Sequence, residues 1–466
     1  MSTAVYRAPG TSQSTTGVSK FLVLATTITS IAGFLYGYDT GIISGALMQI
    51  AREYKLNRQM QEIVASSILV GAVIGGLSCG WLSERFGRRN TVSLVAAIFA
   101  LGAVASSLAS SPLMLILARI FLGFAVGGSS QTVPVYIAEI APAERRGNFV
   151  TAFNVAIGLG IVTASIVGYS LHSPGSWRWM IALAAIPATV LLCCMPLFPK
   201  SPRWLVGMSR HEEARKSLQR VRVAGDDLEQ ELTAIQQTSE KEHSEIKGWP
   251  ALFQPWVRPA TIAALGVAAF TQLSGIEMMI YYAPTILSGA GFGSSAALLA
   301  SVGLAVVYVV MTAVGLMIVE SIGRRRLMLV MIPGSVISLA ILGSMFSKGM
   351  AAGSHAWILV ACLLIYMVFN AGGIQVCGWL MGSEVYPLSV RAAGASAQAG
   401  MIWGADLVVT ITALSLVNLA GTSGTMWIYA GMNLLAFLFV WRFVPETAGL
   451  SLEEIEGALR AGTFKP

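Results

Sequence analysis

The sequence predicts an all-α membrane protein of twelve transmembrane helices arranged in two six-helix halves. Three observations lead to this fold class. Of the 466 residues, 55% are hydrophobic and only 11% are charged, whereas soluble domains carry about 25% charged residues. Apolar runs of about 20 residues, the length that crosses a bilayer core as a helix, recur along the chain. Short motifs from the first half of the chain reappear in the second half.

Twelve apolar runs are long enough to cross a bilayer. The predicted spans are 20–43, 63–82, 91–110, 113–138, 149–170, 178–197, 259–286, 297–319, 326–346, 356–382, 392–418 and 424–443. A long polar stretch divides them six and six, and its part 203–242 predicts short amphipathic helices. We therefore expect a cytoplasmic tail (1–19), a six-helix bundle (20–197), a loop with short helices (198–258), a second six-helix bundle (259–443) and a second tail (444–466).

Lysine and arginine residues indicate the orientation of these helices. Most of the 30 Lys and Arg fall in segments that share one side of the predicted membrane, and positive residues favour the cytoplasmic side. We therefore expect both termini to be cytoplasmic. The first 20 residues lack the separate apolar segment and cleavage site of a signal peptide, so the first apolar run is expected to stay as a helix.

The composition and motifs argue against an enzyme. All five cysteines lie inside apolar runs, which indicates packing between membrane helices rather than a disulfide framework or a zinc site. The sequence has no nucleotide-binding loop and no nucleophile–base pattern. We expect no metal, no cofactor and no nucleic-acid partner.

An internal repeat relates the two halves. GWLSERFGRR (80–89) matches GLMIVESIGRR (315–325), and AEIAPAERRG (138–147) matches SEVYPLSVRAAG (383–394). Two six-helix halves with parallel repeats are the arrangement of the major facilitator fold, in which the solute site lies near the membrane midplane between the halves.

A series of motifs along the chain indicates one family. In chain order they are GYDTGIISGAL (37–47), SERFGRR (83–89), ARIFLGFAVGG (118–128), VPVYIAEIAPAERRG (133–147), PKSPRWL (199–205), QLSGIEMMIYYAP (272–284), VESIGRR (319–325), GWLMGSEVYPLSVRAAG (378–394) and PETAGLSLEEIE (445–456). Together they resemble the sugar porter family of the major facilitator superfamily over nearly the whole chain. The resemblance implies transport of monosaccharides or polyols, by proton symport in many bacterial members and by facilitated diffusion in others.

Four ionisable residues lie well inside predicted spans: Asp39, Arg119, Glu277 and Asp406. Such residues are costly in a bilayer and indicate functional sites. In sugar porters that use protons, an Asp at the GYDT position pairs with an Arg at the start of the fourth helix, which correspond here to Asp39 and Arg119. A carboxyl coupled to a movable cation can bias the open side of a carrier through its protonation. The alternative is a fixed structural ion pair.

The resemblance also assigns a solute site. The positions that match sugar contacts are Asn154, Gln272, Glu277, Trp379 and Trp403, to which we add Asp406 as either a solute contact or a second protonatable group. Polar groups bind hydroxyls, and aromatic rings cover the apolar faces of a sugar. Several positions depart from the hexose pattern, among them Glu277 for the usual Asn, as well as Thr271 and Tyr308. A carboxylate only accepts hydrogen bonds when ionised, so this site reads a different hydroxyl pattern, unless Glu277 is satisfied by a neighbouring helix.

Two clusters of Glu and Arg predict ion-pair networks at the cytoplasmic face. The first contains Glu84, Arg88, Arg89, Glu139 and Arg146, and the second contains Glu320, Arg324, Arg325, Glu384 and Arg391. In the family such networks hold the outward-open state, and the planar guanidinium suits bidentate pairing with carboxylates. Lys200 replaces an acidic residue that the family carries in its PESPR motif, whereas Glu446 keeps it in the second half. We therefore expect a weaker or differently paired link to the loop helices in the first half.

These observations predict a secondary active transporter that imports a neutral monosaccharide, polyol or cyclitol by proton symport through alternating access. The expected partners are a small neutral polyhydroxylated solute, protons and the lipid bilayer, with a monomer as the functional unit in a bacterial inner membrane. A facilitative uniporter is the alternative. A non-transporting nutrient sensor is less consistent with the short segment after the last span.

Overall fold

The computed structural model describes residues 19–142, 145–173, 175–223, 228–242, 249–289, 291–348, 356–387, 390–450 and 452–465. The predicted tail 1–19 lies outside the described residues except for Ser19. The described secondary structure is helical. The first half contains α1 (Lys20–Glu53), α2 (Arg58–Phe86), α3 (Arg88–Ser107), α4 (Pro112–Ile140), α5 (Arg146–Ser170), α6 (Trp177–Ala182), α7 (Ala185–Cys194) and the 3-10 helix η2 (Met195–Leu197).

Three short helices follow the first half: α8 (Pro202–Gly207), α9 (His211–Val221) and α10 (Leu228–Glu242). The second half contains η3 (Trp249–Phe253), α11 (Arg258–Leu273), α12 (Ile276–Gly289), α13 (Ser294–Ile322), α14 (Arg324–Ser347), α15 (Ala356–Gly372), α16 (Ile374–Glu384) and α17 (Arg391–Phe443), and α18 (Leu452–Ala461) ends the described chain.

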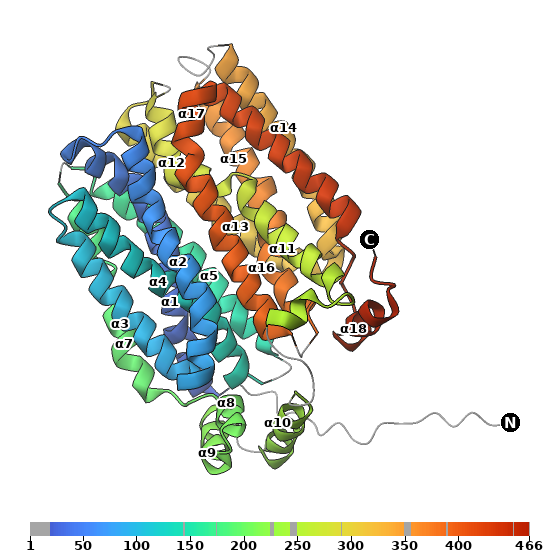
Figure 1. Cartoon of the computed structure of the whole chain (residues 1–466). Helices are drawn as coiled ribbons and strands as arrows, with labels where there is room; N and C mark the ends of the chain where they lie inside the picture. Colours follow the sequence, from blue (N-terminus) through green and yellow to red (C-terminus); the bar gives the residue numbers. More distant parts are fainter. Residues whose placement is uncertain are drawn as a thin grey trace.

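The predicted fold class is confirmed. Eleven helical stretches of the described chain are long and apolar enough to cross a membrane. The last of them, Ala393–Phe443, contains two spans, because the backbone leaves helical geometry at Gly421 (φ 71°, ψ 168°). Figure 1 shows α17 reversing direction at the end of the molecule that is remote from α8–α10. The described part of the chain therefore contains twelve transmembrane helices in two six-helix halves.

Each half is held together mainly by its own helices. In the first half α2 packs on α4 and α1 on α5, and in the second half α14 and α11 pack on α17. Glycine permits close approach at these crossings, since a Cβ at Gly71 or Gly123 would collide with the backbone of the facing helix. Small residues are typical of membrane helix interfaces for this reason. The described parts of the two halves meet mainly where α2 packs on α17, α5 on α13, and α1 on α12.

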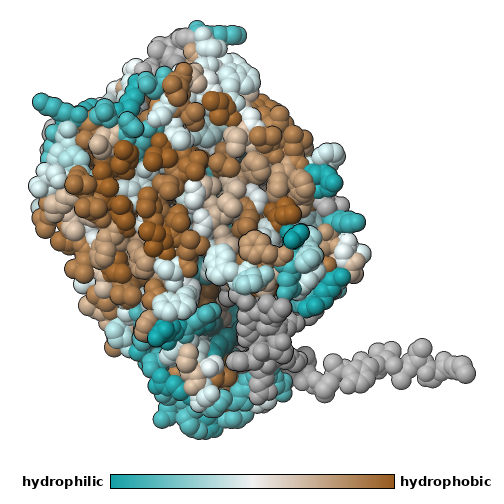
Figure 2. Space-filling view, viewed as in Figure 1, coloured by the Kyte–Doolittle hydropathy of each residue, from teal (hydrophilic) through white to brown (hydrophobic). Residues whose placement is uncertain are grey.

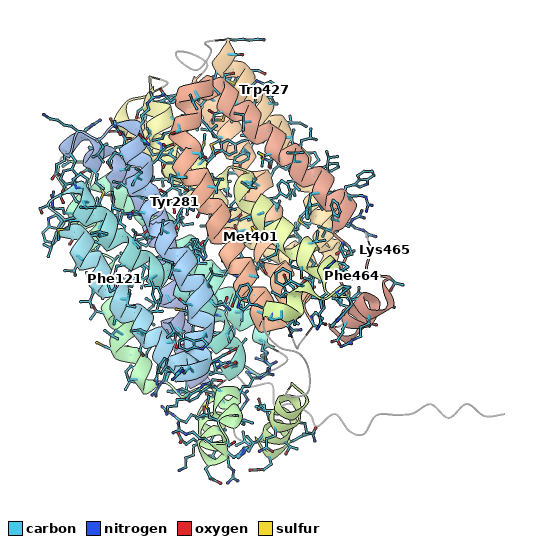
Figure 3. The ribbon with its side chains drawn as sticks, in the orientation of Figure 1. Phe121, Tyr281, Met401, Trp427, Phe464 and Lys465 are labelled. Atoms are coloured by element: carbon cyan, nitrogen blue, oxygen red, sulfur yellow. The ribbon has the colours of Figure 1, made fainter. Side chains whose placement is uncertain are left out.

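The outer surface fits a lipid environment. Figure 2 shows a broad apolar band across the visible face of the bundle, with hydrophilic residues gathered toward its two ends. Large apolar side chains such as Phe121, Met401 and Trp427 are exposed on this surface (Figure 3). In water such a surface would be unfavourable, whereas lipid chains cover it without cost.

The loop helices belong with the first half. Leu205, Ala214, Leu218 and Leu232 form a small apolar core of their own between α8, α9 and α10. Arg222, at the end of α9, joins this core to the bundle because it donates to the carbonyl of Ile140 at the end of α4.

Candidate functional site

A break in the seventh span sets the position of Glu277. Helix α11 ends before Ser274, and α12 begins after Gly275, whose φ of 94° requires glycine. The Ser274 carbonyl accepts hydrogen bonds from the Tyr366 hydroxyl (2.9 Å) and from Asn433 Nδ2 (2.8 Å). These donors satisfy the break inside the bundle, so Glu277 starts a new helix deep in the protein.

Asp39 and Arg119 come together as the sequence predicts. Arg119 Nη2 lies 3.6 Å from Asp39 Oδ2, and the two side chains are 1% and 6% exposed. Arg119 Nε donates to the Val64 carbonyl at 3.1 Å, whereas neither terminal nitrogen of Arg119 makes a hydrogen bond. The pair is thus a long, buried ion contact between α1 and α4, and the arginine is anchored to α2 by a single bond.

Glu277 and Asp406 are two further carboxyls inside the bundle. Both are nine-tenths or more buried. Asp406 Oδ1 accepts from the Thr410 hydroxyl at 3.0 Å, while Glu277 Oε2 has no hydrogen-bond partner. None of the ion pairs found in the described part of the chain involves either carboxyl.

Trp403 and Gln272, two further residues of the predicted solute site, are also buried. The ring of Trp403 packs edge-on against Tyr36 at 5.0 Å between centroids, and its Nε1 donates to Ser130 Oγ at 3.2 Å. Trp403 therefore connects the second half to α1 and α4 of the first half. Gln272 is buried and its Oε1 has no partner.

The remaining predicted contacts are less buried. Asn154 on α5 and Trp379 on α16 are half-buried. Among the described residues, no hydrogen bond joins either side chain to the buried carboxyls. Tyr308 is more deeply buried, and its hydroxyl accepts from Gln375 Nε2 at 3.4 Å. A small cavity with a water-accessible volume of about 10 Å³ lies between the halves beside this region, lined by Gly41, Ser44, Ile161, Ser165, Met279, Ile280, Ser301, Leu304 and Ala305.

The two predicted Glu/Arg clusters lie at one end of the bundle, which we call the clamp face, and the end with Gly421 is the opposite face. In the first clamp, Arg88 Nε lies 2.9 Å from Glu139 Oε2, and Ser201 Oγ donates to the same carboxylate at 2.5 Å. Arg89 donates instead to the carbonyls of Pro196 and Phe198 at 3.3 and 3.1 Å.

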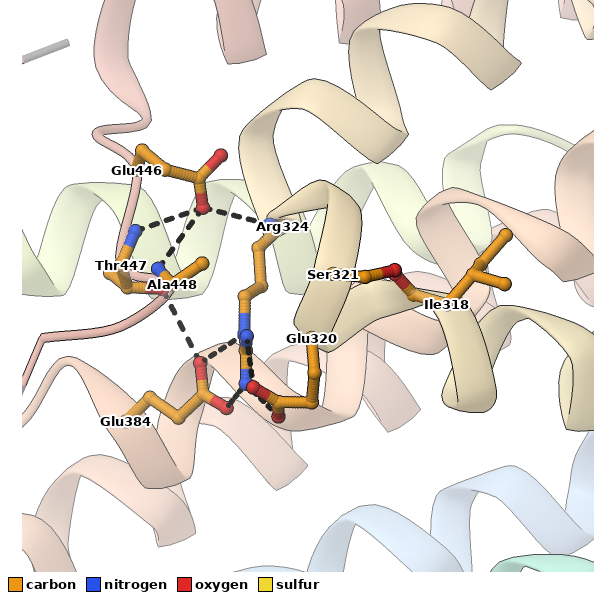
Figure 4. Close-up of polar contacts among 8 residues, drawn as sticks. All are labelled: Ile318, Glu320, Ser321, Arg324, Glu384, Glu446, Thr447 and Ala448. Atoms are coloured by element: carbon orange, nitrogen blue, oxygen red, sulfur yellow. Dashed lines mark hydrogen bonds and ion pairs between the residues drawn. The ribbon is translucent and has the colours of Figure 1, made fainter.

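The second clamp is more densely paired (Figure 4). Arg324 makes two bonds to Glu384, at 2.9 and 2.7 Å, and pairs with Glu320 through Nη1 at 2.9 Å. Glu446 Oε1 accepts from the backbone nitrogens of Arg324 (2.8 Å), Thr447 (3.0 Å) and Ala448 (3.2 Å). This carboxylate therefore caps the first turn of α14.

Three parts of the predicted clamps are corrected by the structure. The Glu84 side chain is exposed and pairs with no arginine among the described residues; its backbone carbonyl accepts from Trp204 Nε1 at 2.7 Å. Arg89 and Arg325 bind carbonyls rather than carboxylates, Arg325 at Trp441 (2.9 Å). The reason is helix geometry, since each follows the pairing arginine by one residue and points about 100° away from it.

The last two cluster residues lie where a helix begins. Arg146 starts α5 and is half-buried. Arg391 starts α17 and donates to the Tyr386 carbonyl at 3.2 Å.

Comparison with known proteins identifies the family. The family model described as "Sugar (and other) transporter" matches residues 25–459. The chain belongs to the sugar transporter family. It is 40% identical to the putative metabolite transport protein YwtG of Bacillus subtilis (strain 168), covering 92% of this chain and 93% of that protein. It is 34% identical to the galactose-proton symporter of Escherichia coli (strain K12), covering 93% and 94%.

A solved structure agrees with the fold of this transporter. The xylose transporter XylE from E. coli, in a partially occluded inward open conformation, matches with a TM-score of 0.81 and 28% identity over 93% of this chain and 100% of that chain. These matches together show that the chain is a membrane transporter of the sugar porter family. Its family and its structural neighbours are transporters, not enzymes.

The sequence did not reveal how the transporter closes at the opposite face. Glu62 on α2 is 1% exposed, and it accepts from both the backbone nitrogen and the hydroxyl of Ser415 on α17, each at 2.6 Å. Arg58 donates to Asn418 at 3.2 Å one turn further out. The sequence does not predict this contact, because a Glu just before the predicted span 63–82 looks like an ordinary surface residue, and only its place against α17 shows otherwise.

Proposed function

We propose that this transporter imports a neutral monosaccharide, polyol or cyclitol together with protons, by alternating exposure of a central site. The observation that carries the proposal is the buried Asp39–Arg119 pair, with 3.6 Å between charged atoms. Protonation of the carboxylate in such a buried ion pair changes the relative stability of the conformations of the transporter.

The physical argument rests on what happens when Asp39 is neutralised. Removing one partner of a buried pair leaves an uncompensated charge, at a cost of about 3–5 kcal/mol. Arg119 then keeps only its bond to the Val64 carbonyl. A conformation that offers Arg119 a new acceptor or water becomes relatively more stable, so protonation and opening are linked.

The surroundings support a neutral polyhydroxylated solute. Trp403 and Tyr36 supply aromatic faces, and Gln272 and Glu277 supply unpartnered oxygens for hydroxyl donors. Buried carboxyls disfavour anionic sugars by repulsion. The named substrates of relatives, galactose and xylose, are neutral sugars.

The orientation and membrane are part of the same proposal. We place the clamp face, with Arg88 and Arg324, in the cytoplasm, because positive residues collect there. Import then follows from an inward proton gradient. A bacterial inner membrane accords with the bacterial relatives.

One observation favours a second candidate, an uncoupled uniporter. Arg119 is fully buried and tied to α2, which also suits a fixed structural pair. In that case the carrier would equilibrate its solute regardless of pH.

The test is uptake into proteoliposomes of labelled D-glucose, D-galactose, D-xylose and myo-inositol, with and without an inward proton gradient. We expect gradient-dependent accumulation in the unaltered protein, and exchange without accumulation in Asp39→Asn. Glu53→Gln is the matched control, since Glu53 is on the same helix but pairs with Arg178 near the opposite face at 2.8 Å; it should accumulate normally. Equilibration by the unaltered protein regardless of the gradient would favour the uniporter, and gradient-driven accumulation by Asp39→Asn would show that coupling does not depend on Asp39.

A further inference from the structure

Glu62 is a buried carboxylate near the opposite face, where α2 and α17 lie side by side (Figure 1). Its two oxygens accept separate donors from one residue: Oε1 accepts the backbone N–H of Ser415 and Oε2 accepts its hydroxyl, each at 2.6 Å. Glu62 is 1% exposed, and none of the ion pairs in the described part of the chain involves it. Two hydrogen bonds, rather than a salt bridge, therefore satisfy this charge.

A carboxylate is an unfavourable choice if its role is only to close the contact between α2 and α17. Burying a charge costs free energy, and a well-packed apolar pair of similar volume closes a contact without that cost. The neighbouring bond from Arg58 to Asn418 is exposed and avoids the cost in another way. The buried charge of Glu62 therefore indicates a second role, in the conformation in which α17 has moved away from α2.

Glu62 lies outward of the predicted solute site. On α17, Ser415 follows Asp406 by about two and a half turns, or about 14 Å. Between these two levels, the Tyr282 hydroxyl of α12 donates to the Thr410 carbonyl at 2.9 Å. A solute that enters between α2 and α17 from the opposite face therefore meets Glu62 before it reaches the level of Asp406.

The two donors of Ser415 match those of a sugar or polyol. A vicinal diol presents two O–H donors on adjacent carbon atoms, and a carboxylate accepts both at once, one at each oxygen. Hydrogen bonds to a charged acceptor are stronger than those between neutral groups. Once Ser415 has moved away, a diol therefore supplies what the carboxylate has lost.

We infer that Glu62 is an outer binding subsite for the solute, at which its carboxylate accepts the two hydroxyls of a vicinal diol in place of the N–H and O–H of Ser415. The inference rests on the proposed function for the class of solute, and it adds the place where the solute first binds. Because the solute and Ser415 compete for the same two oxygens, a bound solute also favours the conformation that is open to the opposite face.

The test compares the solute with its monodeoxy analogues in the unaltered protein, in Glu62→Ala and in Ser415→Ala. The solute is whichever of D-glucose, D-galactose, D-xylose and myo-inositol the transporter carries. The measurement is the initial uptake rate, far below saturation, in cells of a host strain that lacks its own uptake of that solute. The ratio of the rates for solute and analogue cancels any effect of a variant on closing, since that effect is the same for both compounds.

For one pair of adjacent hydroxyls, we expect removal of either hydroxyl to lower the rate about tenfold or more in the unaltered protein and in Ser415→Ala. In Glu62→Ala the same removal should change the rate by less than about threefold. Glu62→Gln should lie between these values, because its amide offers a single acceptor oxygen. Asn418→Ala is the matched control: it removes the exposed bond to Arg58 on the same part of α17 and should keep the full ratio.

Three results would overturn the inference: the same ratios in Glu62→Ala as in the unaltered protein, loss of the ratios in Ser415→Ala as well, or no sensitive pair of adjacent hydroxyls in the unaltered protein. If Glu62→Ala does not fold, the nearly isosteric Glu62→Gln decides by the same ratio. Uptake without proton-driven accumulation would leave the inference standing and refute only the symport. Uptake of none of the four neutral solutes would refute the proposed class of solute and the inference with it.

Discussion

The glycine that ends α2 and the glycine that ends α13 share a backbone conformation and face different side chains. Gly87 has φ 88° and ψ 145°, and Gly323 has φ 96° and ψ 151°. The indole of Trp204 packs about 3.2 Å from the point where a Cβ on Gly87 would lie, whereas the carboxylate of Glu446 occupies that place at Gly323. The Trp204 ring thus fills this space in the first clamp, and the Glu446 carboxylate, which caps α14, fills it in the second clamp.

This difference follows from one residue of the repeat. Lys200 stands where the second half has Glu446, and its ammonium lies 3.8 Å from Glu213 on α9. The first half thus uses this position to contact a loop helix, and the second half uses it to cap α14. We conclude that the two clamps share a backbone conformation without contributing equally to stability. The second clamp should contribute more to the free energy of unfolding than the first.

Arg324→Ala should have the largest effect. It removes the partner of Glu384, which is 22% exposed, and also breaks the contact with Glu320. We expect a loss of about 2–4 kcal/mol in unfolding free energy, since an unpaired, largely buried carboxylate remains. The measurement is denaturation in detergent followed by tryptophan fluorescence.

The matched control is Arg88→Ala, which removes the ion pair with Glu139 and a bond to the Ser83 carbonyl. It should cost about 1–2 kcal/mol, because only one carboxylate loses its partner. Equal losses in the two variants would contradict the asymmetry between the clamps.

Glu446→Gln should have an intermediate effect. The carboxylate accepts four backbone N–H bonds, including those of Arg324 and Arg326 in the first turn of α14. An amide keeps one acceptor oxygen but loses the charge that favours a helix N-terminus, so we expect a loss of about 1 kcal/mol. Lys200→Gln serves as the comparison by the same denaturation assay, with an expected change below about 0.5 kcal/mol for a partly exposed ion pair. A larger loss in Lys200→Gln would reverse our ranking.

Lys200→Glu should be slightly destabilising on its own, because it replaces a partly exposed ion pair with Glu213 by two like charges. The new carboxylate cannot reach the first turn of α3 while the Trp204 ring packs on Gly87. In a Trp204→Ala background the space is open, and the cap should then stabilise by about 0.5–1 kcal/mol. A double-mutant cycle on unfolding free energies measures this coupling, and simple additivity would show that Trp204 does not block the cap.

The sequence was sufficient for the fold and for contacts that repeat or resemble a family. Apolar runs predicted twelve spans, and the repeat predicted both Arg–Glu pairs of the clamps. The approach of Asp39 to Arg119 followed from resemblance alone. The local sequence pattern is enough to predict these features, because hydropathy determines where the spans lie and the internal repeat determines which Arg and Glu residues pair in the clamps.

Contacts that depend on the rotation and crossing of distant helices were not predictable. The bonds from Asn433 and Tyr366 to the break at Ser274 join three spans. The placement of Trp204 on Gly87 depends on how the chain leaves the sixth span. In each case a residue with an unremarkable local pattern gains its role from a partner more than 90 positions away in the chain.

The contact between Glu62 and Ser415 has a consequence for the measured affinity. Opening toward the opposite face breaks two bonds to a charged group, each worth about 1.5–3 kcal/mol, and entering water returns part of that energy. Each 1.4 kcal/mol or so of the cost that remains after hydration lowers the population open to that face about tenfold. A solute arriving there binds only the open fraction, so its apparent dissociation constant is the intrinsic one divided by that fraction. The apparent affinity for the solute is thereby set in part outside its binding site, at the opposite face where α2 of the first half meets α17 of the second half.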